Sequence, residues 1–248
     1  MIRFVRKSIL TVCAIIFGIN SLFLNWIIFP ILNATIVKKQ KKIEISSFIV
    51  QKSWYIFIQL MMFLGVFDIK INSKEKLKNI NNHVIVSSHP SYIDVLILIA
   101  LIPRTTCFSA DRFKTNFFMN NIVNSLFITK GDSIEDMQKN AQEILDMGFN
   151  LLIFPSGIRH KVNEHPKIRK GASFIASNTN KNILPIKLST DTDFLQISNS
   201  ICDAGEKKPH YDLIIKNEID INEYLNNYSD KVTLKKELTK KISQELYS

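Results

Sequence analysis

Cysteine and glycine are scarce in this chain of 248 residues. The three cysteines, Cys13, Cys107 and Cys202, form no Cys-x-x-Cys pair. Their spacing excludes a disulfide framework and is typical of a reducing compartment. Only seven glycines and no low-complexity run are present, which excludes a collagen-like or linker-rich chain. Hydrophobic residues make up 46% and charged residues 22%, which excludes both a disordered chain and a polytopic transporter.

Acidic residues are almost absent from the first 52 positions. Eight lysines and arginines stand there against Glu44 alone, so this segment holds +7 of the net charge of +10. The same segment contains the most apolar part of the chain. Basic residues beside apolar segments are attracted to anionic lipid surfaces. A membrane surface is therefore favoured over nucleic acid as the partner, and we expect no nucleic-acid binding.

Residues 8–32 contain no charged residue and would reach about 37 Å as a helix, enough to cross a bilayer. Five residues interrupt the apolar pattern: Gly18, Asn20, Ser21, Asn25 and Pro30. A second uncharged stretch, 53–67, is too short to cross unaided, at about 22 Å. Either a single span or a helical hairpin in one leaflet fits. The hairpin is favoured, because both flanks are basic. A cleaved signal peptide is disfavoured, since no cleavage site follows. We predict a membrane-associated helical segment over 1–70.

Short apolar runs alternate with helical patterns over residues 71–248. The predicted strands are His83–Ser88, Thr105–Ala110, Leu126–Thr129, Asn150–Phe154, Ile183–Leu188 and Tyr211–Lys216. The predicted helices are Tyr92–Leu101, one from Ser133 to Gly148, Ala172–Asn178 and one through Leu234 and Leu246. This alternation predicts an α/β domain with a mixed, largely parallel sheet flanked by helices.

Candidate chemistry begins where the first of these strands ends. His89 follows the strand and precedes Pro90, a residue suited to the first turn of a helix, and Asp94 lies five positions on. From the turn, His89 can lean back toward Asp94. A carboxylate on one imidazole nitrogen fixes the tautomer and leaves the other nitrogen as a general base. The chain has no G-x-S-x-G nucleophile elbow, so the base would act on a hydroxyl of the substrate. The alternative is a capping histidine with an aspartate in the first helical turn.

A second candidate site follows the strand at 150–154. The strand runs into Pro155, Ser156 and Gly157, a turn signal, and then reaches Arg159. Such a turn exposes backbone N–H groups, and a guanidinium beside them can hold a phosphate. An ordinary turn with a solvated arginine is the alternative.

In this order and at this spacing, the two sites resemble the glycerolipid acyltransferase family, whose type members are the 1-acylglycerol-3-phosphate acyltransferases. That family carries His-x-x-x-x-Asp and then Phe-Pro-Glu-Gly-Thr-Arg, matched here by His89…Asp94 and by 154–159. Residues 127–131 resemble its strand that ends in a basic residue, here Lys130. The stretches 169–172 and 183–186 resemble its Lys-Gly-Ala segment and a later strand with proline. The resemblance covers about residues 83–190.

The resemblance implies acyl transfer from acyl-CoA or acyl carrier protein to the hydroxyl of a lyso-lipid. His89 would deprotonate that hydroxyl and Asp94 would orient His89. The implied substrate-binding residues are Lys130, Phe154, Pro155, Ser156, Gly157 and Arg159. No metal and no bound cofactor are implied. The implied partners are membrane lipids, the lyso-lipid acceptor and the thioester donor, with the active site on the cytoplasmic face of a membrane, such as a bacterial inner membrane.

Two departures bear on the acceptor. Ser156 stands where the family has Glu, and Ile158 where it has Thr. A neutral hydroxyl thus replaces a carboxylate, so a specialised acceptor, such as a lyso-ornithine lipid or a polyene-type lipid, competes with 1-acylglycerol-3-phosphate. A lipid or thioester hydrolase and a non-catalytic relative are further alternatives. His160 and His165 bracket a polar loop at a spacing poor for a shared metal.

Overall fold

The computed structural model describes residues 2–77, 79–109, 113–128, 133–162, 164–195, 205 and 207–247. Its α-helices are α1 (Ile2–Phe23), α2 (Phe29–Thr35), α3 (Lys39–Phe63), α4 (Asp94–Leu101), α5 (Asn120–Leu126), α6 (Ile134–Asp146), α7 (Gly171–Thr179), α8 (Ile221–Asn227) and α9 (Lys231–Tyr247). A π-helix, η1 (Leu24–Ile28), joins α1 to α2, and a 3-10 helix, η2 (Lys74–Leu77), follows β1. The strands are β1 (Asp68–Asn72), β2 (Val84–Ser87), β3 (Thr105–Cys107), β4 (Asn150–Ile153), β5 (Ile183–Thr190) and β6 (His210–Ile215).

The described strands form one six-stranded sheet in the order β1-β6-β5-β2-β4-β3. All neighbouring strands are parallel except β5 and β6, which are antiparallel. The sheet is therefore mixed and largely parallel, as the sequence predicted. Because β2, β4 and β5 run in the same direction, their carboxyl ends meet at one edge of the sheet. Ligands of open α/β sheets bind outside that edge.

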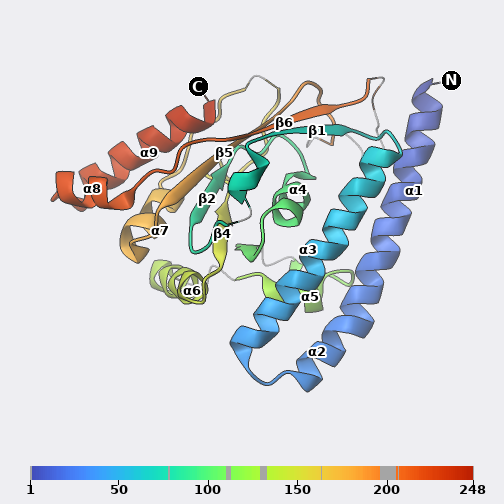
Figure 1. The fold of residues 1–248 in the computed structure, drawn as a ribbon, viewed down its shortest axis with the longest axis horizontal. Helices are drawn as coiled ribbons and strands as arrows, with labels where there is room; N and C mark the ends of the chain where they lie inside the picture. The colour runs from blue at the N-terminus through green and yellow to red at the C-terminus, as the bar shows by residue number, and fades with distance from the viewer. Residues whose placement is uncertain are drawn as a thin grey trace.

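Helices cover both faces of the sheet, with α3, α4 and α5 on one side and α6, α7 and α9 on the other (Figure 1). The central strands are buried on both sides. Ile85 of β2 and Leu152 of β4 belong to the core under α4, whereas Val84 and Leu151 belong to the core under α7 and α9. Such two-sided burial explains why these strands read as continuous apolar runs.

The helix predicted from Ser133 to Gly148 is confirmed together with its ends. The Ser133 side chain accepts a hydrogen bond from the Asp136 backbone N–H at 3.0 Å and so caps α6. Gly148 follows the helix at a φ of +80°, the left-handed conformation that glycine adopts without strain. The amphipathic pattern of α9 is also confirmed, because Leu234 and Leu246 are both buried.

Two expectations about which strands are present differ from the structure. The predicted strand at Leu126–Thr129 is wrong, because Leu126 ends α5 and Ile128 makes only an isolated bridge with Phe108. The apolar run there belongs largely to a helical face. The strand β1 was not predicted, and the boundary expected at residue 70 falls inside it. Its half-exposed edge position gives it a weak apolar pattern.

The N-terminal helices form an antiparallel hairpin that turns at residues 36–38. Phe17 packs on Phe57 at a centroid distance of 5.0 Å, and Asn20 Nδ2 donates to Ser53 Oγ at 2.7 Å. By length and composition, Arg3–Thr35 is long and apolar enough to cross a membrane. Arg3 and Lys38 lie at opposite ends of the nearly continuous helix formed by α1, η1 and α2, and the choice between a single span and a hairpin in one leaflet stays a prediction.

Asn25, one of the residues that interrupt the apolar pattern, contacts the rest of the protein. Asn25 is completely buried, and its side chain accepts from the backbone N–H of Asn121 at 2.8 Å. Its Nδ2 donates to Asn120 Oδ1 at 2.7 Å and to the carbonyl of Phe117 at 3.1 Å. Pro30 has no N–H, so it cannot bond the Asn25 carbonyl in the π turn. That carbonyl instead accepts from Asn121 Nδ2 at 2.8 Å.

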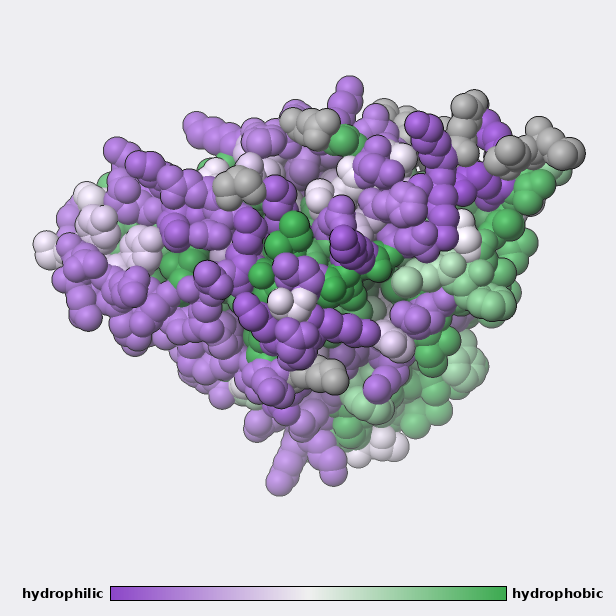
Figure 2. Space-filling model, turned by 45° about the horizontal axis from the view of Figure 1, so that its top comes forward, coloured by the Kyte–Doolittle hydropathy of each residue, from purple (hydrophilic) through white to green (hydrophobic). Residues whose placement is uncertain are grey.

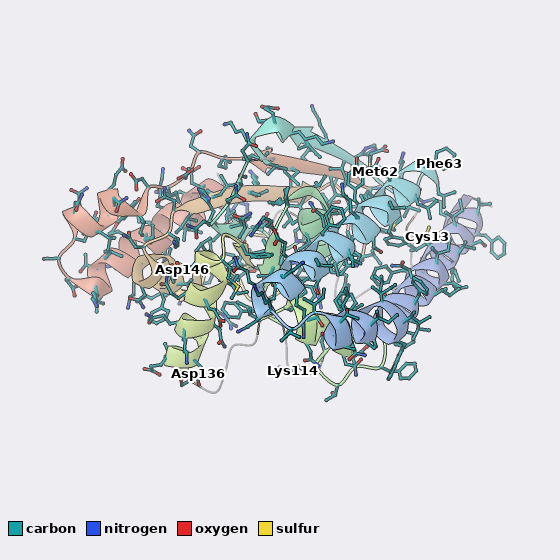
Figure 3. All side chains as sticks on the ribbon, turned by 60° about the horizontal axis from the view of Figure 1, so that its bottom comes forward. Cys13, Met62, Phe63, Lys114, Asp136 and Asp146 are labelled. Atoms are coloured by element: carbon teal, nitrogen blue, oxygen red, sulfur yellow. The ribbon has the colours of Figure 1, made fainter. Side chains whose placement is uncertain are left out.

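The opposite side of this helix is apolar and exposed. Figure 2 shows hydrophobic residues gathered along the side of the molecule that α1 forms. The exposed large apolar residues on α1, η1 and α2 are Phe4, Val5, Val12, Ile15, Ile16, Ile19, Phe23, Trp26, Ile27 and Ile31. In Figure 3, Cys13 lies on the side of α1 that faces α3, whereas Phe63 points away from the protein at the end of α3. Exposed apolar patches of this extent mark interaction surfaces.

Asn25→Ala should destabilise the protein, because it leaves buried donors and acceptors near the start of α5 without partners. We expect the free energy of unfolding to fall by about 2–3 kcal/mol. This corresponds to a decrease in Tm of roughly 4–12 °C, measurable by thermal denaturation in detergent.

Asn20→Ala is the matched control, since Asn20 lies on the same helix and its side chain donates to one residue of α3. We expect it to cost about 1 kcal/mol. Equal losses of Tm for the two variants would contradict the role of Asn25 as the contact between the N-terminal helix and α5.

Candidate active site

His89 lies in the turn that connects β2 to α4, at the carboxyl edge of the sheet. The helix begins at Asp94 rather than at the predicted Tyr92, so Asp94 is its first residue rather than an interior one. The turn is shaped by that carboxylate, which accepts a hydrogen bond from the backbone N–H of Ser91 at 2.7 Å. The segment after β5 also fixes the turn, because Tyr92 N–H donates to the Leu195 carbonyl at 3.0 Å.

The imidazole of His89 and the carboxylate of Asp94 are in direct contact, as the sequence predicted. Nδ1 of His89 lies 2.9 Å from Oδ2 of Asp94, whose side chain is fully buried. Because a carboxylate only accepts, Nδ1 carries the proton that is shared with it. Nε2 is then the unprotonated nitrogen of neutral His89 and can act as a base. The other carboxylate oxygen, Oδ1, accepts from the hydroxyl of Ser91.

The two candidate sites of the sequence meet at the His89 ring. This ring stacks on Phe154, the residue after β4, at a centroid distance of 4.1 Å and an interplanar angle of 24°. The side chain of His89 remains 14% exposed. Stacking holds the plane of the imidazole while its edge stays accessible, which suits a base that takes a proton from a bound molecule.

The turn after Phe154 is built by Ser156 and Gly157. Ser156 is buried, and its hydroxyl donates to the carbonyl of Ile158 at 2.7 Å, so it closes the turn. Gly157 has a φ of +69°, and a Cβ there would lie 3.2 Å from the Arg169 guanidinium. The backbone conformation therefore favours glycine, and a Cβ there would also make the Arg169 guanidinium shift by a few tenths of an ångström. Pro155 accepts from the backbone N–H of Arg169 at 2.8 Å and ties this turn to the start of α7.

Arg159 extends from the same turn toward the His89 loop. Its guanidinium lies over the ring of Tyr92, 3.5 Å from the centroid, in a cation–π arrangement. Among the described residues no acceptor is bonded to its buried Nε. A guanidinium that an aromatic ring orients at the rim of a site can bind a carboxylate or phosphate bidentately.

His160 joins the two loops and was given no role by the sequence. Its ring nitrogen Nε2 accepts a hydrogen bond from the backbone N–H of His89 at 3.3 Å. The backbone N–H of His160 in turn donates to the carbonyl of His89 at 3.2 Å. Its Nδ1 lies 3.1 Å from the carbonyl of Lys161, so the neutral ring is protonated there. Burial lowers the pKa of His160, which favours this neutral, accepting form. Its place directly after Arg159 was the only signal in the sequence.

The structure thus brings together most of the residues that the sequence singled out. His89, Asp94, Phe154 and Arg159 lie around one site, with Pro155, Ser156 and Gly157 in the turn that supports it. Lys130 lies outside the described residues, as do its neighbours 129 and 131. Ser91, Tyr92 and His160 take part in the geometry and were not predicted to do so.

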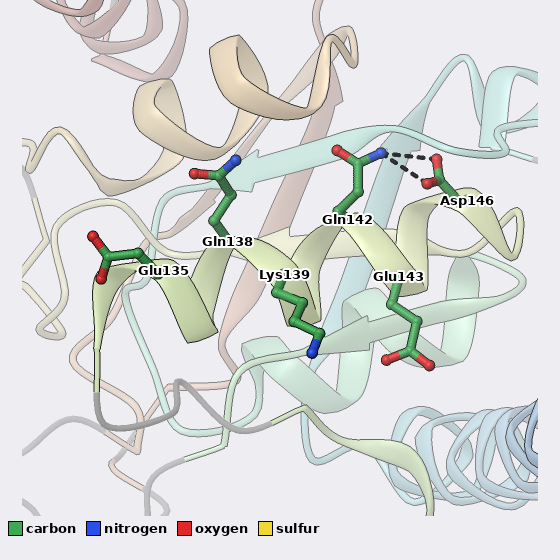
Figure 4. Close-up of a pocket in the computed structure, with 6 residues that line it drawn as sticks. All are labelled: Glu135, Gln138, Lys139, Gln142, Glu143 and Asp146. Atoms are coloured by element: carbon green, nitrogen blue, oxygen red, sulfur yellow. Dashed lines mark hydrogen bonds between the residues drawn. The ribbon is translucent and has the colours of Figure 1, made fainter.

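A separate pocket lies on α6, away from these loops (Figure 4). Two of its three carboxylates have partners. Glu143 pairs with Lys39 at 2.6 Å, and Asp146 pairs with Lys181 at 3.3 Å and accepts from Gln142. Because these pairs neutralise Glu143 and Asp146, we assign this pocket no chemistry.

Comparison with known proteins agrees with this geometry. Residues 68–189 match the family described as Acyltransferase, a range that contains His89, Asp94 and the turn at 154–159. No curated protein matches the chain significantly. The crystal structure of the 1-acyl-sn-glycerophosphate (LPA) acyltransferase PlsC from Thermotoga maritima is similar in fold, with a TM-score of 0.69, 17% identity and full coverage of both chains. Residues 68–189, which carry this site, therefore form an acyltransferase domain, and together with the shared fold they support an acyltransferase enzyme of the glycerolipid acyltransferase family.

Proposed function

We propose that this protein is a membrane-associated O-acyltransferase that moves a fatty acyl group from a thioester donor to the hydroxyl of a lyso-lipid similar to 1-acylglycerol-3-phosphate. The observation that carries the proposal is the contact of 2.9 Å between His89 and the buried Asp94, within a domain of the acyltransferase family. The similar enzyme from Thermotoga maritima is named as an LPA acyltransferase, which favours the same class of acceptor.

In this mechanism Nε2 of His89 takes the proton from the acceptor hydroxyl. The oxygen attacks the thioester carbonyl carbon, and the tetrahedral intermediate collapses with cleavage of the carbon–sulfur bond. The thiolate leaves and takes the proton back from His89, so that ester and free thiol are the products. Asp94 stabilises the imidazolium formed between these steps and keeps Nδ1 protonated throughout. No covalent acyl-enzyme is required.

The acceptor head group would lie beside the turn at 154–159. Arg159 is oriented there by Tyr92 and supplies a positive charge, and the guanidinium of Arg169 packs over Gly157 next to it. An anionic head group such as phosphate fits this charge. Ser156 supports the turn through its hydrogen bond to the Ile158 carbonyl. Because Ser156 stands where the family has a glutamate, the site is more positive by one charge than a site with that carboxylate. That difference favours a phosphate over a zwitterionic lyso-ornithine head group.

The exposed apolar side of α1 to α2 would insert into the membrane. Arg3 and Lys7 near one end and Lys38 near the other add attraction to anionic lipids. We place the active site on the cytoplasmic face, where acyl-CoA and acyl carrier protein are found, and either carrier could deliver the acyl group. In this proposal the helices that precede β1 are the membrane unit and the sheet with its other helices is the catalytic unit, so the boundary expected at residue 70 moves to the segment between α3 and β1.

Substitution of the base tests the mechanism directly. His89→Ala should lower kcat by at least about 10²–10⁴-fold, because the acceptor hydroxyl would lose its general base. Asp94→Asn should also be severely impaired through loss of the correct tautomer. The measurement is transfer from acyl-CoA to 1-acylglycerol-3-phosphate, followed by mass spectrometry of the product.

His83→Ala is the matched control, because His83 precedes β2 at the end opposite to His89 and pairs with Glu218. We expect it to retain activity. Transfer by His89→Ala at more than about a tenth of the parent rate would refute the mechanism. Thioester consumption that is equally fast without acceptor would indicate a hydrolase instead.

Arg159→Ala should mainly affect the acceptor. Loss of a charge-assisted contact costs about 1.5–3 kcal/mol, so kcat/KM for 1-acylglycerol-3-phosphate should fall by about 10–100-fold. Donor parameters should change less. Arg159→Lys should restore only part of the loss, since lysine keeps the charge but not the planar, stacked fork.

Arg104→Ala provides a matched control, because Arg104 also lies over an aromatic ring, that of Phe149, at 4.8 Å, but on the far edge of the sheet. Its loss should lower stability and leave the acceptor KM unchanged. If Arg159→Ala alters the donor KM more than the acceptor KM, the head-group role of Arg159 is wrong.

The membrane proposal predicts that high salt does not release the protein from vesicles, because salt screens the basic residues but not apolar insertion. Ile19→Glu should weaken binding, since it places a charge on the exposed apolar side of α1. Val232→Glu, an equally exposed position on α9, should have no effect. Sedimentation with vesicles measures both. Quantitative release by salt would contradict insertion.

A further inference from the structure

A buried chain of hydrogen bonds extends from the His89–Asp94 pair to β6, two strands away from β2 in the sheet. The hydroxyl of Ser91 contacts Asp94 Oδ1, and the hydroxyl of Tyr211 lies 3.0 Å from the hydroxyl oxygen of Ser91. Tyr211 belongs to β6, which β5 separates from β2 in the sheet. Ser91, Asp94 and Tyr211 are all completely buried. The chain therefore runs through the protein interior from β6 to the rim of the site.

The direction of each bond in the chain is fixed. The carboxylate of Asp94 can only accept, so the single hydroxyl hydrogen of Ser91 points to Oδ1. The Ser91 oxygen must then accept from the hydroxyl of Tyr211. Burial, together with the nearby charge of Asp94, raises the pKa of Tyr211. The phenol therefore stays protonated at neutral pH and donates to Ser91.

This arrangement fixes the orientation of the carboxylate. Oδ2 accepts from the Ser91 backbone N–H and contacts His89, while Oδ1 is held by the Ser91 hydroxyl. A carboxylate bonded on one oxygen only could rotate and carry the imidazole with it. The phenol, in turn, selects the rotamer of Ser91 that donates to Asp94. Phe67 packs edge-on against the Tyr211 ring at 5.6 Å and keeps the ring in place.

We propose that Ser91 and Tyr211 are positioning residues for acyl transfer, which hold the Asp94 carboxylate and through it the His89 imidazole in the reactive orientation. Neither touches the substrate. The inference rests on the proposed function, because it assigns the two hydroxyls to the same His89–Asp94 pair. The inference connects β6, the strand of Tyr211, to the site, although no motif of the sequence indicates that connection.

A double-mutant cycle tests this proposal. Tyr211→Phe removes one hydroxyl and keeps the ring, so the fold is preserved. We expect kcat to fall by about three- to tenfold, with the KM values for acceptor and donor unchanged. Ser91→Ala removes the direct bond to Asp94 and should lower kcat by about 10–100-fold. Tyr211→Phe added to Ser91→Ala should change kcat by less than about twofold, since the chain is already broken.

Thermal stability gives a second readout, because the change in Tm caused by Tyr211→Phe should have opposite signs in the parent and in Ser91→Ala. Ser91→Ala leaves the Tyr211 hydroxyl buried without its acceptor, which is costly. Adding Tyr211→Phe should therefore raise the Tm of Ser91→Ala, although the same substitution lowers the Tm of the parent. Thr106→Val is the control: it removes a buried hydroxyl of β3 that donates to the Leu126 carbonyl at 2.7 Å. It should lower Tm and leave kcat unchanged.

Two results would overturn the proposal. One is a wild-type kcat for Tyr211→Phe. The other is a loss from Tyr211→Phe that is the same with and without Ser91. If Ser91→Ala does not fold, the cycle is made with Asp94→Asn, which must likewise remove the effect of Tyr211→Phe. Activity of His89→Ala would refute the proposed function and this role together, whereas inactive His89→Ala with fully active Tyr211→Phe would refute this role alone.

Discussion

The buried negative charge of Asp94 is the constraint on which the centre of this protein depends. A carboxylate removed from water costs several kcal/mol unless donors surround it. Here His89 and both the backbone and the hydroxyl of Ser91 supply them. All three lie within five residues of Asp94, so the turn between β2 and α4 must be tight. The helix consequently starts at Asp94 itself, and the imidazole is fixed by the same contacts that satisfy the charge.

The second loop of the site is built without ion pairs among its described contacts. Phe154 supports the His89 ring by stacking, and His160 bonds the His89 backbone in both directions. The carboxyl ends of β2 and β4 lie side by side because the two strands are parallel neighbours, and these contacts join the loops that follow them. The resulting rim carries Arg159 on Tyr92, so that the guanidinium of Arg159 and the imidazole of His89 are positioned by different loops but on one edge of the sheet.

The N-terminal helices reverse the pattern of a soluble protein. Their polar residues, Asn20 and Asn25, face other parts of the chain, while many of their large apolar residues are exposed. Such an inside-out distribution suits a surface in contact with lipid, where apolar side chains need no burial and polar ones need partners. The bonds from Asn25 to the start of α5 tie that surface to the catalytic domain. The orientation of the domain toward the membrane would then follow from a few buried amides.

The sequence by itself determined the fold class, most of the strands and helices, and the His89–Asp94 pair. These features depend on periodicity and on spacing within a few residues, which a chain displays locally. It also predicted the turn at 154–159, because proline and glycine have strong local preferences. Only the tertiary structure decided that Ser156 is buried in the turn, that Asn25 bonds α5, and that Tyr211 reaches Ser91. Each of these features depends on the residues that surround a side chain in space, and no local pattern of the sequence records them. Contacts across 120 positions, such as that of Tyr211 with Ser91, arise from the order of strands in the sheet, and a single sequence carries no signal for that order.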